Sequence, residues 1–340
     1  MAVLQSFLNI QWIPLVSILV FLWTGSPPAF AHHGVAGIGV AALQGPGAPI
    51  EAASSATLPD SKFLLYFKLD HADYETFDSD RANPESDYDN FWIGGLGYGV
   101  TSWFSAYLFV PYNQKEDEPG GFDTSGFADI SLFGQVGFKW DEGFRLIPPN
   151  ESLDDFEDWH FTVIGGFTIP TGDDNVRDDD GNIDPGKSNG FGSPSYFTGL
   201  TATRVVGDQW TMNLELSRTA FTENTYADGN RSRFGTEYRV NPALIYRAYT
   251  HPKHKVRLDI SGEPQYLHLG RDRTNGENER ATGGDILYML GGVRGYWRNL
   301  SAAVGAKVPI WKDLNEEDDQ QGGEGTENYR FIFTLSVLFP

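Results

Sequence analysis

Apolar and polar residues alternate along most of the chain. In the C-terminal sequence FIFTLSVLF, Phe331 and Phe333 fall on one face of an extended strand, whereas Thr334 and Ser336 fall on the other. A period of two is the signature of a β-strand, because successive side chains point to opposite faces. The same alternation recurs in the segments 210–217, 237–247, 256–263 and 300–310. The pattern predicts strands with one apolar and one polar face.

These runs have the length of membrane-crossing strands, which need about nine to eleven residues when tilted. A sheet in lipid must close on itself, because an open edge would leave backbone groups unpaired. We therefore predict an all-β fold, an antiparallel transmembrane β-barrel of about twelve strands. A soluble β-sandwich also alternates, but its strands are shorter. The predicted strands are 62–71, 91–100, 103–113, 126–140, 159–171, 191–204, 209–221, 233–249, 255–269, 284–298, 299–312 and 327–339.

The connections between the predicted strands alternate between short and long. Outer-membrane barrels have short periplasmic turns and longer extracellular loops. The short links are 100–103, 205–210, 250–255 and 297–300, and the long links are 72–90, 114–125, 172–190, 222–232, 270–283 and 313–326. The link 141–158 departs from the rule because it is long on the periplasmic side. Tryptophans at the ends of the runs predict aromatic girdles at both interfaces, at positions 92, 103, 140, 159, 210, 297 and 311.

The N-terminus carries the pattern of an export signal. The run 13–23 is apolar but too short to span a bilayer, and the triplet Ala29-Phe30-Ala31 matches the small-residue cleavage site. No Lys or Arg precedes the run, which departs from the usual signal. We predict a signal peptide over 1–31, cleaved after Ala31, and a bacterial outer-membrane location. Residues 32–60, rich in Gly, Ala and Pro, form a periplasmic segment that is either a plug in the barrel lumen or a disordered tail, and the barrel follows over 61–340.

Composition excludes several classes of function. The formal net charge is -21, whereas nucleic-acid binding needs a cationic surface. The chain has no cysteine, which removes thiol catalysis and thiolate metal sites. The acidic residues concentrate in the long links, so we predict long acidic extracellular loops. These loops either share divalent cations with neighbouring lipopolysaccharide or are simply solvated.

Five blocks stand out along the predicted strands: GLGYGVTSWFSAYLFVPY (95–112), GFADISLFGQVGF (126–138), GGFTIPTGD (165–173), AAVGAKVPIW (302–311) and FTLSVLF (333–339). These blocks resemble one known family, the outer-membrane transporters of the MetA-pathway of phenol degradation. Together they span most of the predicted mature chain, and the family is related in architecture to the fatty-acid and aromatic-hydrocarbon outer-membrane channels. Phe339 resembles the aromatic end of the barrel-assembly signal, although Pro340 follows it.

The resemblance implies a channel for small hydrophobic or aromatic compounds, without assigning phenol as the substrate. The implied partners are outer-membrane lipid and lipopolysaccharide, the barrel-assembly machinery and a small hydrophobic solute. No catalytic set is recognised, so the chain is not expected to be an enzyme. The alternative is a barrel that does not transport, whose N-terminal His pair or acidic loops bind metal ions or a partner.

The polar faces of the predicted strands carry charges of both signs. Inside a narrow barrel such charges must pair or be hydrated, so they either line a pathway or form a structural network. The candidate lumen residues are Asn213, Glu215, Glu237, Arg239, Arg247, Arg257, Asp259, Glu263, Arg294 and Lys307.

No cofactor is expected, but two metal sites are hypotheses. Cleavage after Ala31 would leave an amine and an imidazole at His32, next to His33, which are ligands for Cu²⁺ or Zn²⁺. The loop sequence DDDGNID offers alternate oxygen ligands for Ca²⁺. These are Asp178, Asp180, Asn182 and Asp184. The competing interpretations are an ordinary cleavage-site sequence and a solvated acidic loop.

Overall fold

The computed structural model describes residues 47–74, 86–119, 121–149, 151, 157–178, 181–316 and 327–339. The predicted signal peptide, His32, His33 and Asp180 lie outside these residues. No helix within the described part of the chain has the length and apolar character needed to cross a membrane.

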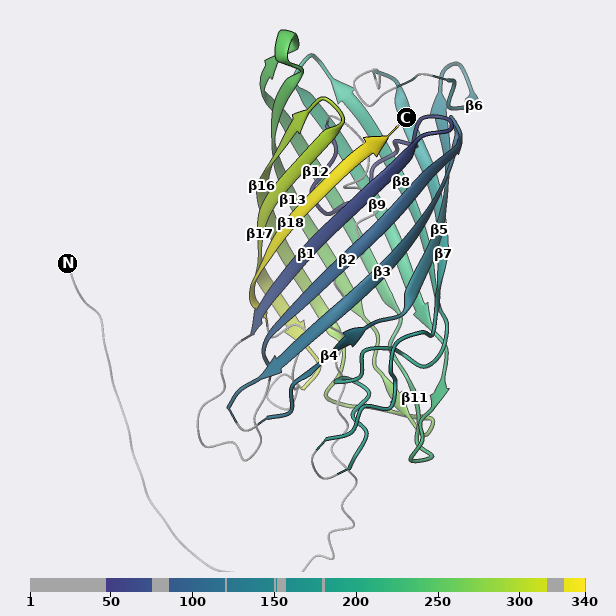
Figure 1. The fold of residues 1–340 in the computed structure, drawn as a ribbon, viewed down its shortest axis with the longest axis vertical. Coiled ribbons are helices and arrows are strands. Elements are labelled where there is room, and N and C mark those ends of the chain that lie inside the picture. Colours follow the sequence, from purple (N-terminus) through teal and green to yellow (C-terminus); the bar gives the residue numbers. More distant parts are fainter. Residues whose placement is uncertain are drawn as a thin grey trace, which may run out of the picture.

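Twelve of the described strands form a closed antiparallel barrel, as the sequence predicts (Figure 1). Each strand pairs with its neighbour along the chain, and β1 closes the barrel by pairing with the last strand, β18. The barrel strands are β1 Phe63–Tyr74, β2 Ser86–Thr101, β3 Phe104–Asp117, β5 Ile130–Trp140, β7 Trp159–Ile169, β8 Ser195–Val206, β9 Trp210–Phe221, β12 Glu237–His251, β13 Val256–Leu269, β16 Gly284–Trp297, β17 Leu300–Leu314 and β18 Glu327–Phe339.

One predicted strand, 126–140, is interrupted. The short strand β4 (Thr124–Phe127) pairs with the end of β3, and β5 begins only at Ile130. Between them, the Ala128 N–H donates to the Pro111 carbonyl at 2.9 Å, while the Asp129 side chain turns toward backbone N–H groups of another loop. At Asp129 the carboxylate binds these N–H groups in place of regular backbone pairing. The strand is therefore interrupted between β4 and β5.

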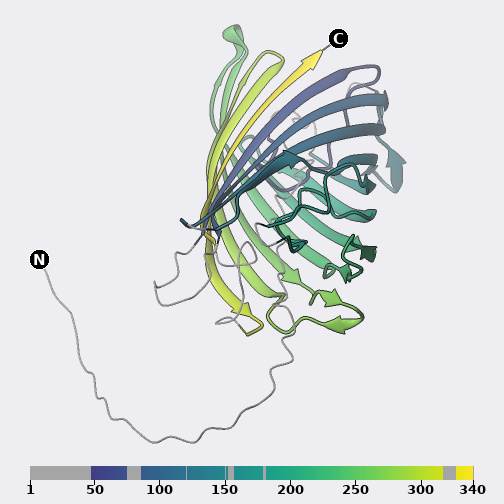
Figure 2. The same cartoon turned by 60° about the horizontal axis from the view of Figure 1, so that its bottom comes forward.

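The short and long connections lie at opposite ends of the barrel, which we name the turn end and the loop end (Figure 1). The link 141–158, at the turn end, contains the short strand β6 (Phe144–Leu146), paired with β5. A 3₁₀ turn, Pro252–His254, joins β12 to β13. At the loop end, β10 (Asn224–Thr225), β11 (Arg231–Arg233), β14 (Arg273–Thr274) and β15 (Glu277–Asn278) form a separate small sheet (Figure 2).

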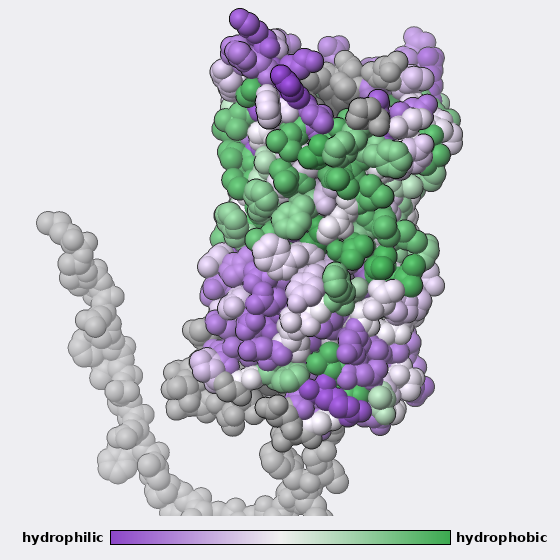
Figure 3. Space-filling view, in the orientation of Figure 1, coloured by the Kyte–Doolittle hydropathy of each residue, from purple (hydrophilic) through white to green (hydrophobic). Residues whose placement is uncertain are grey.

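The outer wall carries an apolar band nearer the turn end than the loop end (Figure 3). Leu200 and Ile310 are both 53 % exposed on this wall, which a soluble protein would avoid over so large an area. Four tryptophans stand at strand ends on the turn side: Trp140, Trp159, Trp210 and Trp297. Aromatic residues in this position mark the edge of the lipid layer.

A Candidate binding cavity in the barrel lumen

Residues 47–58 lie inside the barrel and are almost entirely buried. The segment enters at the turn end, where the Gly47 N–H donates to Asp259 of β13 at 2.9 Å. It returns to the same end before β1, where the Ser61 N–H donates to the Gly99 carbonyl at 2.8 Å. Gly99 is needed there, because a Cβ at this position would lie 2.0 Å from the Pro59 carbonyl oxygen.

Acidic side chains of the barrel wall bind the N–H groups of this segment. The Glu263 carboxylate accepts from Ile50 at 2.5 Å, Glu51 at 3.1 Å and Ala52 at 3.0 Å. The Glu215 carboxylate accepts from Ala53 at 2.7 Å. A segment without strand or helix pairing leaves its backbone groups in need of partners, and these carboxylates supply them.

Basic and amide side chains bind the carbonyl groups of the same segment. Arg294 donates to the Pro49 carbonyl at 2.9 Å, and Asn213 donates to the Ala53 carbonyl at 2.9 Å. The Gln135 amide donates to the carbonyls of Ser54 at 3.1 Å and Ala56 at 3.0 Å. The wall and the segment therefore match donor to acceptor along most of the buried chain.

The ten lumen residues chosen from sequence all lie on the barrel strands, and eight of them are buried: Asn213, Glu215, Glu237, Arg257, Asp259, Glu263, Arg294 and Lys307. Arg239 is half-buried and donates to Glu237 at 3.0 Å. Arg247 is half-buried near the turn end, just before a bulge in β12.

Glu51, at the inner end of the segment, lies between two ammonium groups. Its carboxylate is 2.9 Å from the Lys307 Nζ and 3.5 Å from the Lys68 Nζ. Lys68 in turn lies 3.2 Å from Asp70, which Arg330 also contacts at 3.4 Å. These charges form one buried network that joins the segment to three barrel strands.

Sequence reasoning missed Glu51, Lys68, Asp70 and Arg330. Lys68 and Asp70 were detectable, since they occupy alternate positions in the predicted strand 62–71. Arg330 likewise begins the polar face of the last strand. Glu51 belongs to a segment with no periodic pattern, so its place depends on the tertiary fold alone.

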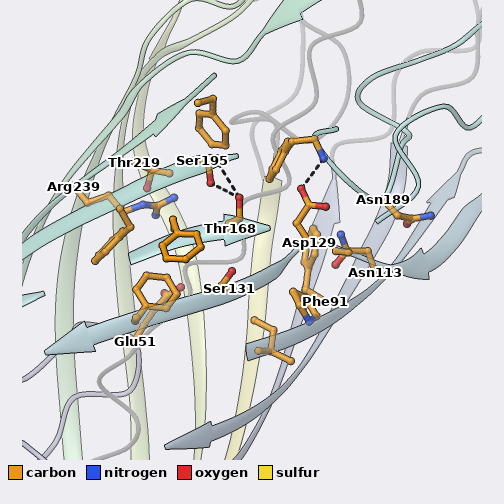
Figure 4. A pocket seen from close by; sticks show the side chains of 18 of the residues that line it. Glu51, Phe91, Asn113, Asp129, Ser131, Thr168, Asn189, Ser195, Thr219 and Arg239 are labelled. Carbon is orange, nitrogen blue, oxygen red and sulfur yellow. Dashed lines mark hydrogen bonds between the residues drawn. The ribbon is translucent and has the colours of Figure 1, made fainter. Parts of the chain in front are cut away.

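A cavity of about 140 Å³ lies between Glu51 and the long loops. Phenylalanines from five strands and one loop form its apolar wall: Phe91, Phe133, Phe167, Phe191, Phe197 and Phe221. Figure 4 shows Glu51, Thr219 and Arg239 on one side of the cavity and Asn113, Asp129 and Asn189 on the other. The arrangement offers a mostly apolar space with polar groups at its margins, which is the usual character of a small-molecule site.

Three buried polar atoms of the cavity lining have no hydrogen-bond partner among the described residues. They are the Gln265 Nε2, the Ser131 Oγ and the Asn189 Oδ1. The Glu51 Oε1 also makes no hydrogen bond there, but it lies 3.5 Å from the Lys68 Nζ. Glu51 and Gln265 are close to each other, because both accept from the Lys307 Nζ, at 2.9 and 3.2 Å. Buried polar atoms nearly always have partners, so a guest that donates and accepts hydrogen bonds here would satisfy them.

The loop between β7 and β8 covers the cavity at the loop end. The Asp129 carboxylate accepts from the N–H groups of Thr171 at 3.0 Å, Gly172 at 2.9 Å and Phe191 at 2.9 Å. The Lys115 Nζ donates to the Ser188 carbonyl at 2.9 Å. Within the loop, burial raises the pKa of Asp184 to about 6, although Lys187 and Lys115 and nearby N–H groups oppose the shift.

In the predicted calcium loop, the side chains of the described residues hydrogen-bond to nearby backbone groups and do not point toward a common centre. The Asp178 Oδ1 accepts from the Asn182 N–H at 2.7 Å, and the Asp184 Oδ1 accepts from the Gly186 N–H at 2.7 Å. Within the described ranges, no group of three or more His, Asp or Glu side chains is arranged to hold a metal ion. Since Asp180 lies outside these ranges, the calcium site stays a prediction, as does the His32–His33 site.

No family model and no curated protein matches the sequence. Among solved structures, the chain is similar to the COG4313 outer-membrane channel from Pseudomonas putida F1, with a TM-score of 0.64 and 13% identity over 84% of this chain and 98% of that one. The β-domain of the Bordetella autotransporter BrkA matches with a TM-score of 0.42 and 10% identity over 82% of this chain and 99% of that one. A TodX mutant, a monoaromatic hydrocarbon channel, matches with a TM-score of 0.37 and 13% identity over 84% and 91%. The first of these likenesses shows the fold of an outer-membrane barrel.

Proposed function

We propose that the protein is an outer-membrane channel for small hydrophobic or aromatic compounds, and that the phenylalanine-lined cavity binds them in transit. The observation that carries the proposal is this cavity of about 140 Å³ inside the barrel. An engineered apolar cavity of about 150 Å³ in another protein binds benzene, so the volume fits one aromatic ring. The proposal is one of binding and passage, and it involves no catalysis.

The lengths of the connections support an orientation in the membrane. In outer-membrane barrels short turns face the periplasm and long loops face outward. The turn end would then be periplasmic, and residues 47–58 would enter the lumen from that side. This agrees with export under a signal peptide cleaved after Ala31 and with insertion by the barrel-assembly machinery.

We infer further that residues 47–58 act as a plug. The support is the set of hydrogen bonds that the segment donates to Glu263, Glu215 and Asp259 and accepts from Arg294, which hold it across the lumen. A solute arriving through the loops would meet Glu51 at the inner side of the cavity. Passage would require the segment to move.

The polar margin of the cavity bears on which solutes enter. Three carboxylates, Glu51, Asp129 and Glu215, and one guanidinium, Arg239, line the space. A guest carboxylate would add another anion beside these three carboxylates, and a buried charge without a counter-ion is unfavourable. We therefore expect uncharged rings to bind in preference to their carboxylate counterparts.

Calorimetric titration of the purified barrel tests this function. We expect benzyl alcohol to bind about ten-fold or more tightly than benzoate at pH 7, because only the latter carries an unpaired charge into the cavity. The double variant Phe133→Ala/Phe197→Ala should weaken benzyl alcohol binding by removing the apolar wall. Leu200→Ala, on the lipid-facing side, is the matched control. Failure of the wild type to bind either compound, or tighter binding of benzoate, would refute the proposal.

A further inference from the structure

The small sheet at the loop end presents three arginines on one exposed face. Arg231 and Arg233 are two residues apart on β11, so both point to the same side. Arg273 of β14 lies directly opposite Arg233 in the antiparallel register. All three are exposed, and the sheet lies beyond the end of the barrel (Figure 2).

The register brings two like charges together. Residues directly opposite on antiparallel strands have Cβ atoms about 5 Å apart, and like charges in these positions are destabilising. The other face of the same strands carries an uncharged pair. Ser232 and Thr274 are partly buried there, and their hydroxyl groups are hydrogen-bonded at 3.2 Å. A sheet of two- and three-residue strands has little stability with which to offset this repulsion.

Few contacts within the described residues balance these charges. Arg231 lies 3.4 Å from Glu223, and the Arg273 Nε donates to the Asn278 Oδ1 at 2.8 Å. Arg233 makes no ion pair with any residue that the structure describes. The face is therefore cationic, although the chain as a whole has a net charge of -21.

We propose that the face formed by Arg231, Arg233 and Arg273 binds a phosphate-bearing anion. The planar guanidinium donates two parallel hydrogen bonds to phosphate oxygens, and several arginines around one phosphate form a strong anion site. A phosphate group between Arg233 and Arg273 would turn their repulsion into two attractive contacts. The source is either the phosphorylated saccharide of surrounding lipopolysaccharide or free inorganic phosphate.

The position of the sheet makes the glycolipid the better-placed source. The small sheet that carries the arginines lies at the loop end, where Figure 1 labels β11, whereas the apolar band of the barrel wall lies nearer the turn end (Figure 3). We propose that the loop end faces outward. Direct contact between arginines and glycolipid phosphates is a different interaction from the sharing of divalent cations between acidic loops and lipopolysaccharide. It is also independent of the cavity, so it stands whether or not the barrel transports solutes.

Binding assays on the full-length barrel in detergent test the proposal. The probes are a short-chain lipopolysaccharide, the same glycolipid after chemical removal of its phosphates, and inorganic phosphate. We expect the phosphorylated glycolipid to bind the wild type and Arg233→Gln/Arg273→Gln to bind it about ten-fold or more weakly, since two charge-assisted contacts are lost. The matched control is Arg271→Gln/Arg280→Gln, which removes the same charge from the adjoining loop, where the guanidinium groups approach Asn315 and Glu316 at 3.1 and 3.9 Å.

Amide hydrogen exchange of residues 231–233 and 273–274 provides a second readout. The phosphorylated glycolipid should slow exchange in the wild type, and without any anion the variant should exchange more slowly than the wild type because the repulsion is gone. Equal slowing by inorganic phosphate alone would support the anion site and assign it to a free oxyanion. Equal binding of the two glycolipids, or equal losses in the variant and its control, would overturn the proposal.

Discussion

Lys307 joins the lumen segment to the barrel wall through a buried ammonium group. Its ammonium group donates to Glu51 on the lumen segment at 2.9 Å and to Gln265 on β13 at 3.2 Å. It also lies 4.7 Å from the ring centroid of Tyr288. Because the side chain is buried, water does not replace these contacts if the ammonium is lost.

Removing this ammonium should destabilise the protein strongly. Lys307→Met leaves Glu51 with only the more distant Lys68, and breaking a buried ion pair from one side costs about 3 kcal/mol or more. Urea unfolding followed by heat-modifiable gel migration would measure the loss. The double variant Lys307→Met/Glu51→Gln should recover part of the stability, and the exposed Lys253→Met is the control. A single variant as stable as the control would contradict the role assigned to Lys307.

The loop between β7 and β8 is the element whose stability should respond to pH. Asp184 has its pKa raised from 3.8 to about 6 by burial. The folded loop therefore holds the proton more tightly than the open loop does, and its stability is greatest below pH 4. Stability falls as the pH rises toward 6, because the carboxyl must then ionise in a buried place.

We expect amides of residues 186–188 to lose protection from hydrogen exchange between pH 4 and pH 7. The shift of about two pKa units corresponds to at most about a hundred-fold change in the local opening equilibrium. Asp184→Asn should remove this dependence and keep the loop closed at pH 7. Asp178→Asn, at a half-buried position in the same loop whose hydrogen bond to Asn182 is open to solvent, is the matched control. Protection factors that rise with pH, or that change equally in both variants, would contradict the assignment.

Strands were predictable in number and order because each long strand alternates between lipid and lumen. β13 and β17, for example, follow the predicted 255–269 and 299–312 to within two residues. The break at Ala128–Asp129 was not predictable, since Asp129 is held by N–H groups from residues 171, 172 and 191. Such contacts arise only when the loop folds over the barrel mouth, and a local pattern does not contain them.

At the scale of the whole molecule, side chains of the barrel wall supply the hydrogen-bond partners of the lumen segment. The polar faces of the strands, chosen from sequence as lumen-lining, carry the partners that the backbone of residues 47–58 requires. Sequence left open whether this segment enters the lumen, because a stretch rich in Gly, Ala and Pro has no periodicity that specifies a partner. The partners are specified instead by buried acids and a base on β9, β13 and β16, together with the amides of Asn213 and Gln135.

The plug proposal predicts opposite effects of deleting and of fixing the segment. Deletion of residues 34–58 should raise single-channel conductance in planar bilayers, because it removes the chain that crosses the lumen. The double variant Ser55→Cys/Thr203→Cys should form a disulfide when oxidised and so tie the segment to the barrel wall. The two native hydroxyl oxygens lie 3.0 Å apart, and the chain has no other cysteine. Uptake of a neutral aromatic solute into proteoliposomes should then stop under oxidation and return on reduction. Single-cysteine variants control for the substitutions. Unchanged conductance after deletion, together with unchanged uptake by the oxidised variant, would show that the segment is a fixed part of the wall and not a plug.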